Sequence, residues 1–259
     1  MSSVPLATIA DHLDALLRTS AITDYPNAVN GVQLAHRGPV TRVAASVDIS
    51  RRVIEQVVAA RANLLLVHHG MFWGGLQPLR GVQYERIRLL FDHDVAVYAA
   101  HLPLDAHPDI GNNVLLAREL GLTPDGGFAE HQGTMIGVRG AADVETAGLV
   151  ERARAFARQH GGDVRCTPVD AGRRTHRWAI CTGAGASAAT LAEAASLEVD
   201  TLIVGEGPHW TAVDAPENGI VIIYAGHYAT ETLGVRALAG RIAGVFDLPW
   251  SFIEAPTGL

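Results

Sequence analysis

The sequence predicts a layered α/β/α fold built from a duplicated α/β unit. Short β-branched apolar runs alternate with amphipathic stretches along the 259 residues, which is the pattern of strands followed by helices. The second half of the chain also repeats the first. We therefore expect two halves, residues 1–125 and 126–259, built into one compact body.

The first half is expected to alternate helices and strands up to Gly121, a typical C-terminal helix cap. Apolar residues at helical spacing predict the helices, and leucine- and valine-rich runs predict buried strands. Residues 124–133 are rich in glycine and acid and are interpreted as a connection. The expected helices are residues 5–18, 51–61, 84–93 and 113–120, and the expected strands are 41–47, 63–67 and 95–100.

The second half is expected to follow the same plan. Strands are expected near Met135 and Val164 and over residues 178–182, 201–204 and 220–224, with helices over 144–160, 188–195 and 232–243. The repeat aligns residues 63–70 with 200–207 and residues 97–105 with 223–231. In the second alignment His101 matches His227, and a carboxylate follows each histidine four residues later. Two copies favour a duplicated unit with a site between its halves, since a solenoid needs more repeats.

The composition excludes several function classes. All twenty basic residues are arginine, so Schiff-base lysines, phosphate-loop lysines and Ser–Lys dyads are absent. The net charge of −7 does not favour nucleic acid as a partner. No apolar run reaches the roughly 18 residues of a membrane span, and the N-terminus lacks an export pattern. We expect a cytoplasmic protein in which Cys166 and Cys181 are free buried thiols.

Histidines and acids stand where the predicted strands end. His68 and His69 follow a buried strand directly, and ligands of open α/β sheets gather at such ends. His227 and Glu231 have the i, i+4 spacing that places both on one helix face. Each feature also has an ordinary interpretation: polar residues opening a loop, a surface His–Glu pair, or Asp105 capping the helix that follows it.

Together these residues predict a metal site. Nitrogen and oxygen ligands without cysteine suit zinc, iron, manganese or nickel. Three imidazoles and two carboxylates are too many for one closed tetrahedral site and suit two ions about 3.5–4 Å apart. The candidate ligands are His68, His69, Asp105, His227 and Glu231.

Four spaced segments resemble the GTP cyclohydrolase 1 type 2 homologue family, also called NIF-three-like, in its short form. They are His68-His-Gly-Met-Phe-Trp, His101-Leu-Pro-Leu-Asp105 with Ile110-Gly-Asn-Asn, Gly205-Glu-Gly-Pro-His209, and Gly226-His-Tyr-Ala-Thr-Glu231; Asn30-Gly-Val-Gln33 is similar to the N-terminal signature of the family. The resemblance implies a toroidal homohexamer with a dinuclear site, Glu231 as the bridging ligand, and His101 and His209 near the metals in a second shell. Gly70 departs from the family, in which many members have proline.

A competing motif, Gly183-Ala-Gly185-Ala-Ser187, follows a strand and opens a helix, with Glu206 ending the next strand. This is similar to a dinucleotide fingerprint, but a glycine turn with Ser187 as the helix cap gives the same pattern. No Gly-x-Ser-x-Gly segment is present, so a hydrolase of that type is not indicated.

The sequence therefore predicts a protein with two divalent ions per chain, and a metal-dependent hydrolase is the first hypothesis for its function. A small-molecule substrate is compatible with this hypothesis, although no catalytic residue can be assigned. A metal carrier without turnover and a ring-shaped scaffold or regulatory protein are the alternatives.

Overall fold

The computed structural model describes residues 2–259, and the chain forms two compact units. Unit 1 comprises Met1–Leu104 and Gly234–Ala255, and unit 2 comprises Asp105–Leu233 and Pro256–Leu259. These units differ from the expected halves 1–125 and 126–259, the first of which begins one residue outside the described range. Helix α5 (Asn112–Glu119) packs into the core of unit 2, and α9 (His227–Phe246) leaves unit 2 after its first turns.

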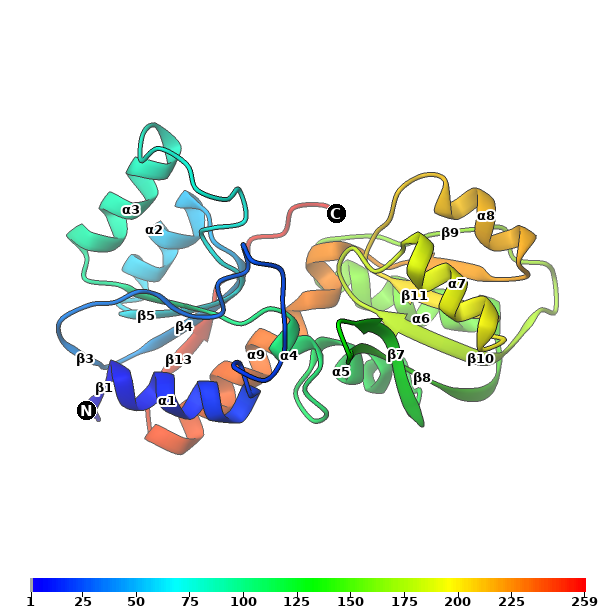
Figure 1. Ribbon diagram of the computed structural model, residues 1–259, viewed down its shortest axis with the longest axis horizontal. Helices are drawn as coiled ribbons and strands as arrows, with labels where there is room; N and C mark the ends of the chain where they lie inside the picture. Colours follow the sequence, from blue (N-terminus) through cyan, green and yellow to red (C-terminus); the bar gives the residue numbers. More distant parts are fainter. Residues whose placement is uncertain (1) are drawn as a thin grey trace. The chain divides into compact units, whose positions relative to one another are not determined.

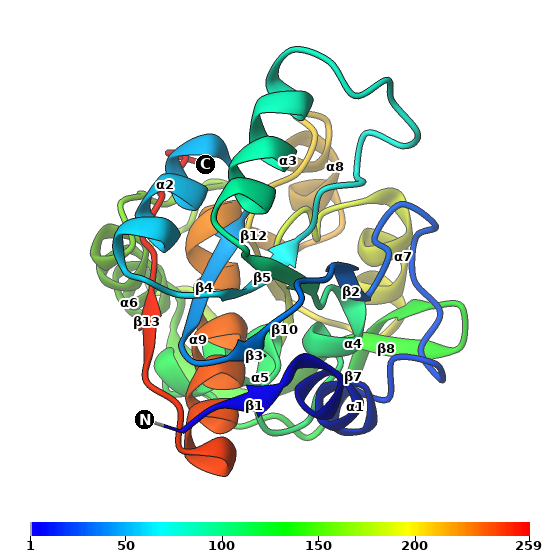
Figure 2. The ribbon, with the colours of Figure 1, turned by 90° about the vertical axis from the view of Figure 1, so that its left-hand side faces the viewer.

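Unit 1 is a five-stranded sheet with helices on both faces (Figures 1 and 2). In pairing order, its strands are β13 (Trp250–Phe252), β4 (Val43–Asp48), β5 (Leu64–His69), β6 (Ala96–Ala99) and β2 (Gly31–Leu34). The first four are parallel, and β2 is antiparallel to β6. Helices α2 (Arg51–Ala59) and α3 (Val82–Asp92) cover one face, and α1 (Leu6–Leu17) and the later part of α9 cover the other (Figure 2). Strands β1 (Val4–Pro5) and β3 (Pro39–Val40) form a separate two-stranded ladder.

The core of unit 1 explains why its strands are apolar throughout. Leu65 and Val67 of β5 belong to the same buried cluster as Val53 of α2 and Leu90 of α3. On the other face, the Tyr98 hydroxyl donates to a carboxylate oxygen of α1 at 2.7 Å. Because helices cover both faces of a parallel sheet, both sides of each strand must be apolar.

Unit 2 is a six-stranded mixed sheet that also carries helices on both faces (Figure 1). In pairing order, its strands are β7 (Gly126–His131), β8 (Thr134–Glu145), β10 (Arg174–Cys181), β11 (Thr201–Val204), β12 (Val221–Tyr224) and β9 (Arg165–Cys166). Strands β10, β11 and β12 are parallel to one another, and the other three are antiparallel to their neighbours. The helices are α5, α6 (Thr146–Gln159), α7 (Ala188–Ser196), α8 (Thr211–Glu217) and the start of α9. The short α4 (Leu102–Asp105) ends at the first residue of unit 2.

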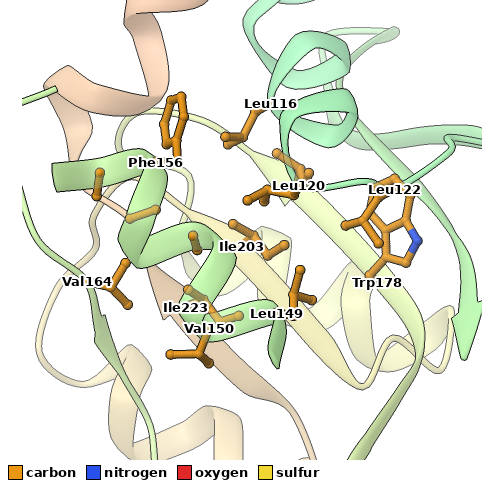
Figure 3. Close-up of a cluster of buried hydrophobic side chains, with 14 of the residues drawn as sticks. Leu116, Leu120, Leu122, Leu149, Val150, Phe156, Val164, Trp178, Ile203 and Ile223 are labelled. Atoms are coloured by element: carbon orange, nitrogen blue, oxygen red, sulfur yellow. The ribbon is translucent and has the colours of Figure 1, made fainter. Parts of the chain in front are cut away.

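Two buried clusters hold the helices of unit 2 to opposite faces of its sheet. Figure 3 shows the first cluster, in which Leu116 of α5 and Phe156 of α6 lie with Trp178 and Ile203 of the sheet. The second cluster joins α7 and α8 to the alternate residues of the same strands, such as Leu202. Alternate residues of a strand point to opposite faces, so the central strands of this sheet are apolar on both sides.

The expected duplication is present in the internal topology of the two units. Each passes through an antiparallel edge strand, a first parallel strand, a helix, the central strand, a second helix and the third parallel strand. These elements are β2, β4, α2, β5, α3 and β6 in unit 1, and β9, β10, α7, β11, α8 and β12 in unit 2. The α/β fold class predicted from the sequence is therefore confirmed.

Hydrogen bonds correct the sequence alignment of the repeat by one residue at its third strand. The Ala100 amide donates to the Val67 carbonyl, and the Ala225 amide donates to the Val204 carbonyl. Since Val67 and Val204 occupy equal positions in the two central strands, Ala100 corresponds to Ala225. The two histidines that the sequence aligns are therefore displaced by one position.

Several elements differ from expectation. The glycine-rich stretch expected as a connection contains β7, which forms a hairpin with β8, because strand pairing overrides weak local propensity. Strands β2 and β13 and helix α8 were not expected. Cys181 is buried as predicted, but Cys166 is exposed, because it lies on the two-residue edge strand β9. Within residues 2–259, no helix is long and apolar enough to cross a membrane.

Candidate metal centre

His68 and His69 end strand β5, whose preceding residues are buried. His68 is fully buried and His69 is partly exposed. Their ring centroids lie 4.9 Å apart. The two imidazoles therefore lie side by side at the carboxyl end of the unit 1 sheet, the edge at which ligands of α/β sheets bind.

His101, which directly precedes α4, joins these two imidazoles in unit 1. Its ring centroid lies 5.0 Å from that of His68 and 5.7 Å from that of His69. One ring nitrogen of each histidine lies within 4.8 Å of the other two. Three imidazole nitrogens at this spacing can hold one divalent ion. The geometry of unit 1 thus places His101 close enough to His68 and His69 to share a metal ion with them, whereas the family resemblance implies a second-shell position.

An acceptor holds Nδ1 of each of these three rings. The acceptor is the Ala100 carbonyl for His68 (2.8 Å), Asp48 for His69 (2.9 Å) and Asp24 for His101 (2.9 Å). Because carbonyl and carboxylate oxygens accept hydrogen bonds, Nδ1 carries a proton in each ring, and Nε2 has a lone pair for a metal whenever the ring is neutral. Metal-binding histidines are oriented in this way, so the cluster fits a divalent ion.

Asp24 was not among the residues selected from the sequence. Its carboxylate also accepts hydrogen bonds from the Leu102 amide at 3.0 Å and from Asn30 at 2.8 Å. Burial raises the pKa of Asp24, but the hydrogen bond and charge of His101 and the other donors outweigh burial and hold the pKa below its ordinary value. An ionised Asp24 therefore fixes both the ring of His101 and the start of α4.

Asp105 lies at the end of α4 in unit 2 and is buried. It does not cap the following helix, since Gly111 is the N-cap residue of α5. Instead, its carboxylate accepts a hydrogen bond from the Asn112 side chain at 2.8 Å. Asn113 donates to the carbonyl of Ile136 and accepts from the Thr182 amide, which ties the start of α5 to the sheet. Asn112 thus holds this carboxylate, and Asn113 anchors the helix that carries Asn112.

His227 and Glu231 occupy the first two turns of α9. Their i, i+4 spacing brings Nε2 of His227 within 3.1 Å of a Glu231 oxygen, and Nδ1 lies 2.8 Å from Glu206. Burial lowers the pKa of His227, but Glu231 and then Glu206 outweigh burial and raise that pKa to about 9. Without a metal, the ring is therefore a cation between two carboxylates, which is a place that a divalent cation can occupy.

The turn after β10 is shaped around Glu231. Gly183 has φ +61°, and a Cβ at this position would collide with the Glu231 carboxylate and lie 3.3 Å from Nε2 of His227. The buried thiol of Cys181 lies in the same region: burial first, then the charges of Asp105 and Glu231, raise its pKa to about 12. The thiol is therefore protonated, which agrees with a site made of nitrogen and oxygen donors.

The glycine turn does not have the features of a dinucleotide loop. Ser187 is the N-cap of α7 and forms a capping box with Thr190. The Glu231 carboxylate lies beside Gly183, and Glu206, the candidate ribose ligand, binds His227. The interpretation as a capped glycine turn therefore describes this segment.

The predicted residues thus form two groups, each described within its own unit. His68, His69 and His101 cluster in unit 1. In unit 2, His227 and Glu231 are in contact, and the charges of Asp105 and Glu231 both raise the pKa of the buried Cys181 thiol. His209 is exposed and lines a pocket of unit 2 together with Glu206. The orienting acids Asp24, Asp48 and Glu206 were not predicted to have this role.

Comparison with known proteins identifies the family of this chain. Residues 4–257 match Duf34/NIF3 (NGG1p interacting factor 3). The chain belongs to the Duf34/NIF3 family. A GTP cyclohydrolase 1 type 2 homolog from Deinococcus radiodurans is 43% identical over 236 residues, which cover 91% of this chain and 88% of that protein.

Two solved structures of similar proteins agree with the fold of this Duf34/NIF3 chain. The protein ybgI, described as of unknown function, has a TM-score of 0.88 at 31% identity, with both chains covered completely. The protein TTHA1606 from Thermus thermophilus has a TM-score of 0.82 at 32% identity, again with complete coverage. The family resemblance that the sequence motifs predict is therefore confirmed.

Proposed function

We propose that this chain binds two divalent metal ions and uses them to hydrolyse a small molecule. The observation that supports this proposal best is the orientation of His68, His69 and His227. An acceptor holds Nδ1 of each ring, which leaves Nε2 as the nitrogen that binds metal. A histidine that only fills space in a core needs no such common arrangement.

We assign the ligand roles to His68, His69, Asp105, His227 and Glu231. Asp105 and Glu231 are only 8% and 3% exposed, and a buried carboxylate favours a nearby cation. Five nitrogen and oxygen donors exceed the needs of one tetrahedral ion and suit zinc, iron, manganese or nickel. The family resemblance implies Glu231 as the bridge between two ions.

Bound divalent ions activate water and stabilise developing negative charge in hydrolysis. The residues of this chain provide orientation: Asp48 and Glu206 hold the rings of His69 and His227. We keep His101 outside the ligand set, as the resemblance implies, and assign proton transfer to it, because its imidazole lies beside those of His68 and His69. The name of the Deinococcus relative, GTP cyclohydrolase 1 type 2 homolog, supports a hydrolytic class.

Metal analysis of untagged protein tests this proposal. After reconstitution we expect about two equivalents of metal per chain, and we expect Glu231→Gln to lower the total strongly. Glu217→Gln is the matched control, because Glu217 is an exposed glutamate of unit 2 and should leave the metal content unchanged.

The loaded protein would then be screened for hydrolysis of small-molecule esters, phosphoesters and cyclic amidines. Metal-dependent turnover that Glu231→Gln abolishes would support the hydrolase. A metal content that never exceeds one equivalent would contradict the dinuclear site, and full loading without any turnover would favour a metal carrier.

A further inference from the structure

Unit 2 contains a pocket of ≈ 450 Å³ that the metal ligands do not account for. Its volume lies in the range typical of small-molecule sites. The loop after β11 forms one wall with Glu206 and His209, and β12 and β9 contribute Tyr224 and Arg165. All of its lining residues belong to unit 2.

Sheet register places Arg165 on the same side as Tyr224. The two residues are directly opposite each other in the antiparallel pair β9–β12, and residues paired in this way extend from the same face of a sheet. The Tyr224 hydroxyl is held by Thr211 at 2.7 Å. Arg165 therefore lies beside a tyrosine that is itself fixed to α8.

The acidic side chains of this pocket do not pair with Arg165. The pocket contains two acidic side chains, and each is already paired: Glu206 with His227 at 2.8 Å, and Asp163 with Arg158 at 3.4 Å. Within residues 2–259, the Arg165 guanidinium has no hydrogen-bond or ion-pair partner. A guanidinium offers a planar set of donors that matches a phosphate or a carboxylate.

The pocket also adjoins the residues that position a candidate metal ligand. Glu206 lines the pocket and holds Nδ1 of His227, and Gly226, another lining residue, directly precedes His227 in the chain. A molecule bound through Arg165 would therefore lie beside the start of α9.

We propose that this pocket binds the substrate of the hydrolase through an oxyanion, a phosphate or a carboxylate, that pairs with Arg165. His209, which lines the same pocket, is the second donor of the site. The claim that the bound molecule is a substrate rests on the proposed function, but the anion site itself can be tested without metal.

The test is isothermal titration calorimetry of metal-free protein with inorganic phosphate and with acetate at constant ionic strength. For Arg165→Met, which keeps most of the side-chain stem, we expect about a tenfold loss of affinity for the preferred anion. Arg118→Met, an exposed arginine of α5 away from this pocket, should leave the affinity unchanged. His209→Ala should give a smaller loss, about threefold, because an imidazole offers fewer N–H donors than a guanidinium.

Metal content separates this inference from the proposed function. Arg165→Met should load as much metal as the wild type, so a loss of anion affinity at unchanged metal content supports the pocket. Stronger binding of phosphate or of acetate identifies which oxyanion the ligand carries. Equal affinity in Arg165→Met and wild type, or equal losses in Arg165→Met and Arg118→Met, would overturn the inference, whatever the metal analysis shows.

Discussion

At the scale of single residues, Gly183 and Glu231 show how closely the backbone approaches the candidate site. Gly183 has φ +61° and leaves room for the Glu231 carboxylate. Gly172 also has a positive φ, +76°, but a Cβ there would meet nothing within 4 Å. The two glycines therefore share a left-handed backbone conformation, but only Gly183 lies against another side chain, that of Glu231.

This pair gives a prediction with its own control. Gly183→Ala should destabilise the protein by about 2–4 kcal/mol and lower its metal content, because the new methyl group displaces Glu231. Gly172→Ala should cost only about 1 kcal/mol, the strain of a left-handed alanine, with full metal content. Urea unfolding and metal analysis measure both effects. Equal behaviour of the two variants would contradict the role of the Glu231 contact.

A second residue-scale prediction concerns pH. Glu231 and Glu206 raise the pKa of His227 from 6.5 to about 9 against the opposing effect of burial. In metal-free protein this stabilisation is fully present below pH 6.5 and is lost as the pH rises through about 9. Denaturant unfolding between pH 6 and pH 10 should show the loss, and His227→Gln should flatten the curve. Protons compete with metal for the same ring, so metal affinity should rise over this interval. A metal affinity that does not change between pH 6 and pH 9 would argue against His227 as a ligand.

At the scale of elements, the start of α7 decides between two interpretations of one glycine-rich segment. Ser187 and Thr190 form a reciprocal capping box there, so Ser187→Ala should destabilise the protein by about 1 kcal/mol. Ser196→Ala, at the last residue of α7, is the control and should have a smaller effect. Thermal unfolding measures this difference, and fluorescence titration with a nicotinamide dinucleotide should detect no binding. Tight binding that Ser187→Ala weakens would restore the dinucleotide interpretation.

At the scale of the whole molecule, the family resemblance leads us to propose a ring-shaped homohexamer. Light scattering should give a mass about six times the 27.4 kDa of the chain, since homo-oligomers normally close by symmetry. Glu231→Gln, a change in a buried side chain, should leave this mass unchanged. A monomer at micromolar concentration would refute the hexamer and leave the metal site unaffected.

The sequence alone predicted the fold class, the duplication and the two histidines at the end of β5. Each of these depends on local patterns: the period of apolar residues, the spacing of repeated motifs, and the polar residues that follow buried runs. The buried strand before His68 and His69 is an example, because a parallel strand covered on both faces reads as an apolar run. Such local patterns can be recognised in the amino-acid sequence without a structure.

The tertiary structure alone decided which residues hold these side chains. Asp24 lies in a loop without periodicity and Asp48 ends a neighbouring strand, yet both bind histidines far along the chain. The alignment of the third strands of the repeat likewise could be determined only from the hydrogen bonds. A shift of one residue leaves the apolar pattern of a fully buried strand almost unchanged. Long-range pairing depends on packing between distant segments, and the spacing of residues in one segment carries no record of its partner.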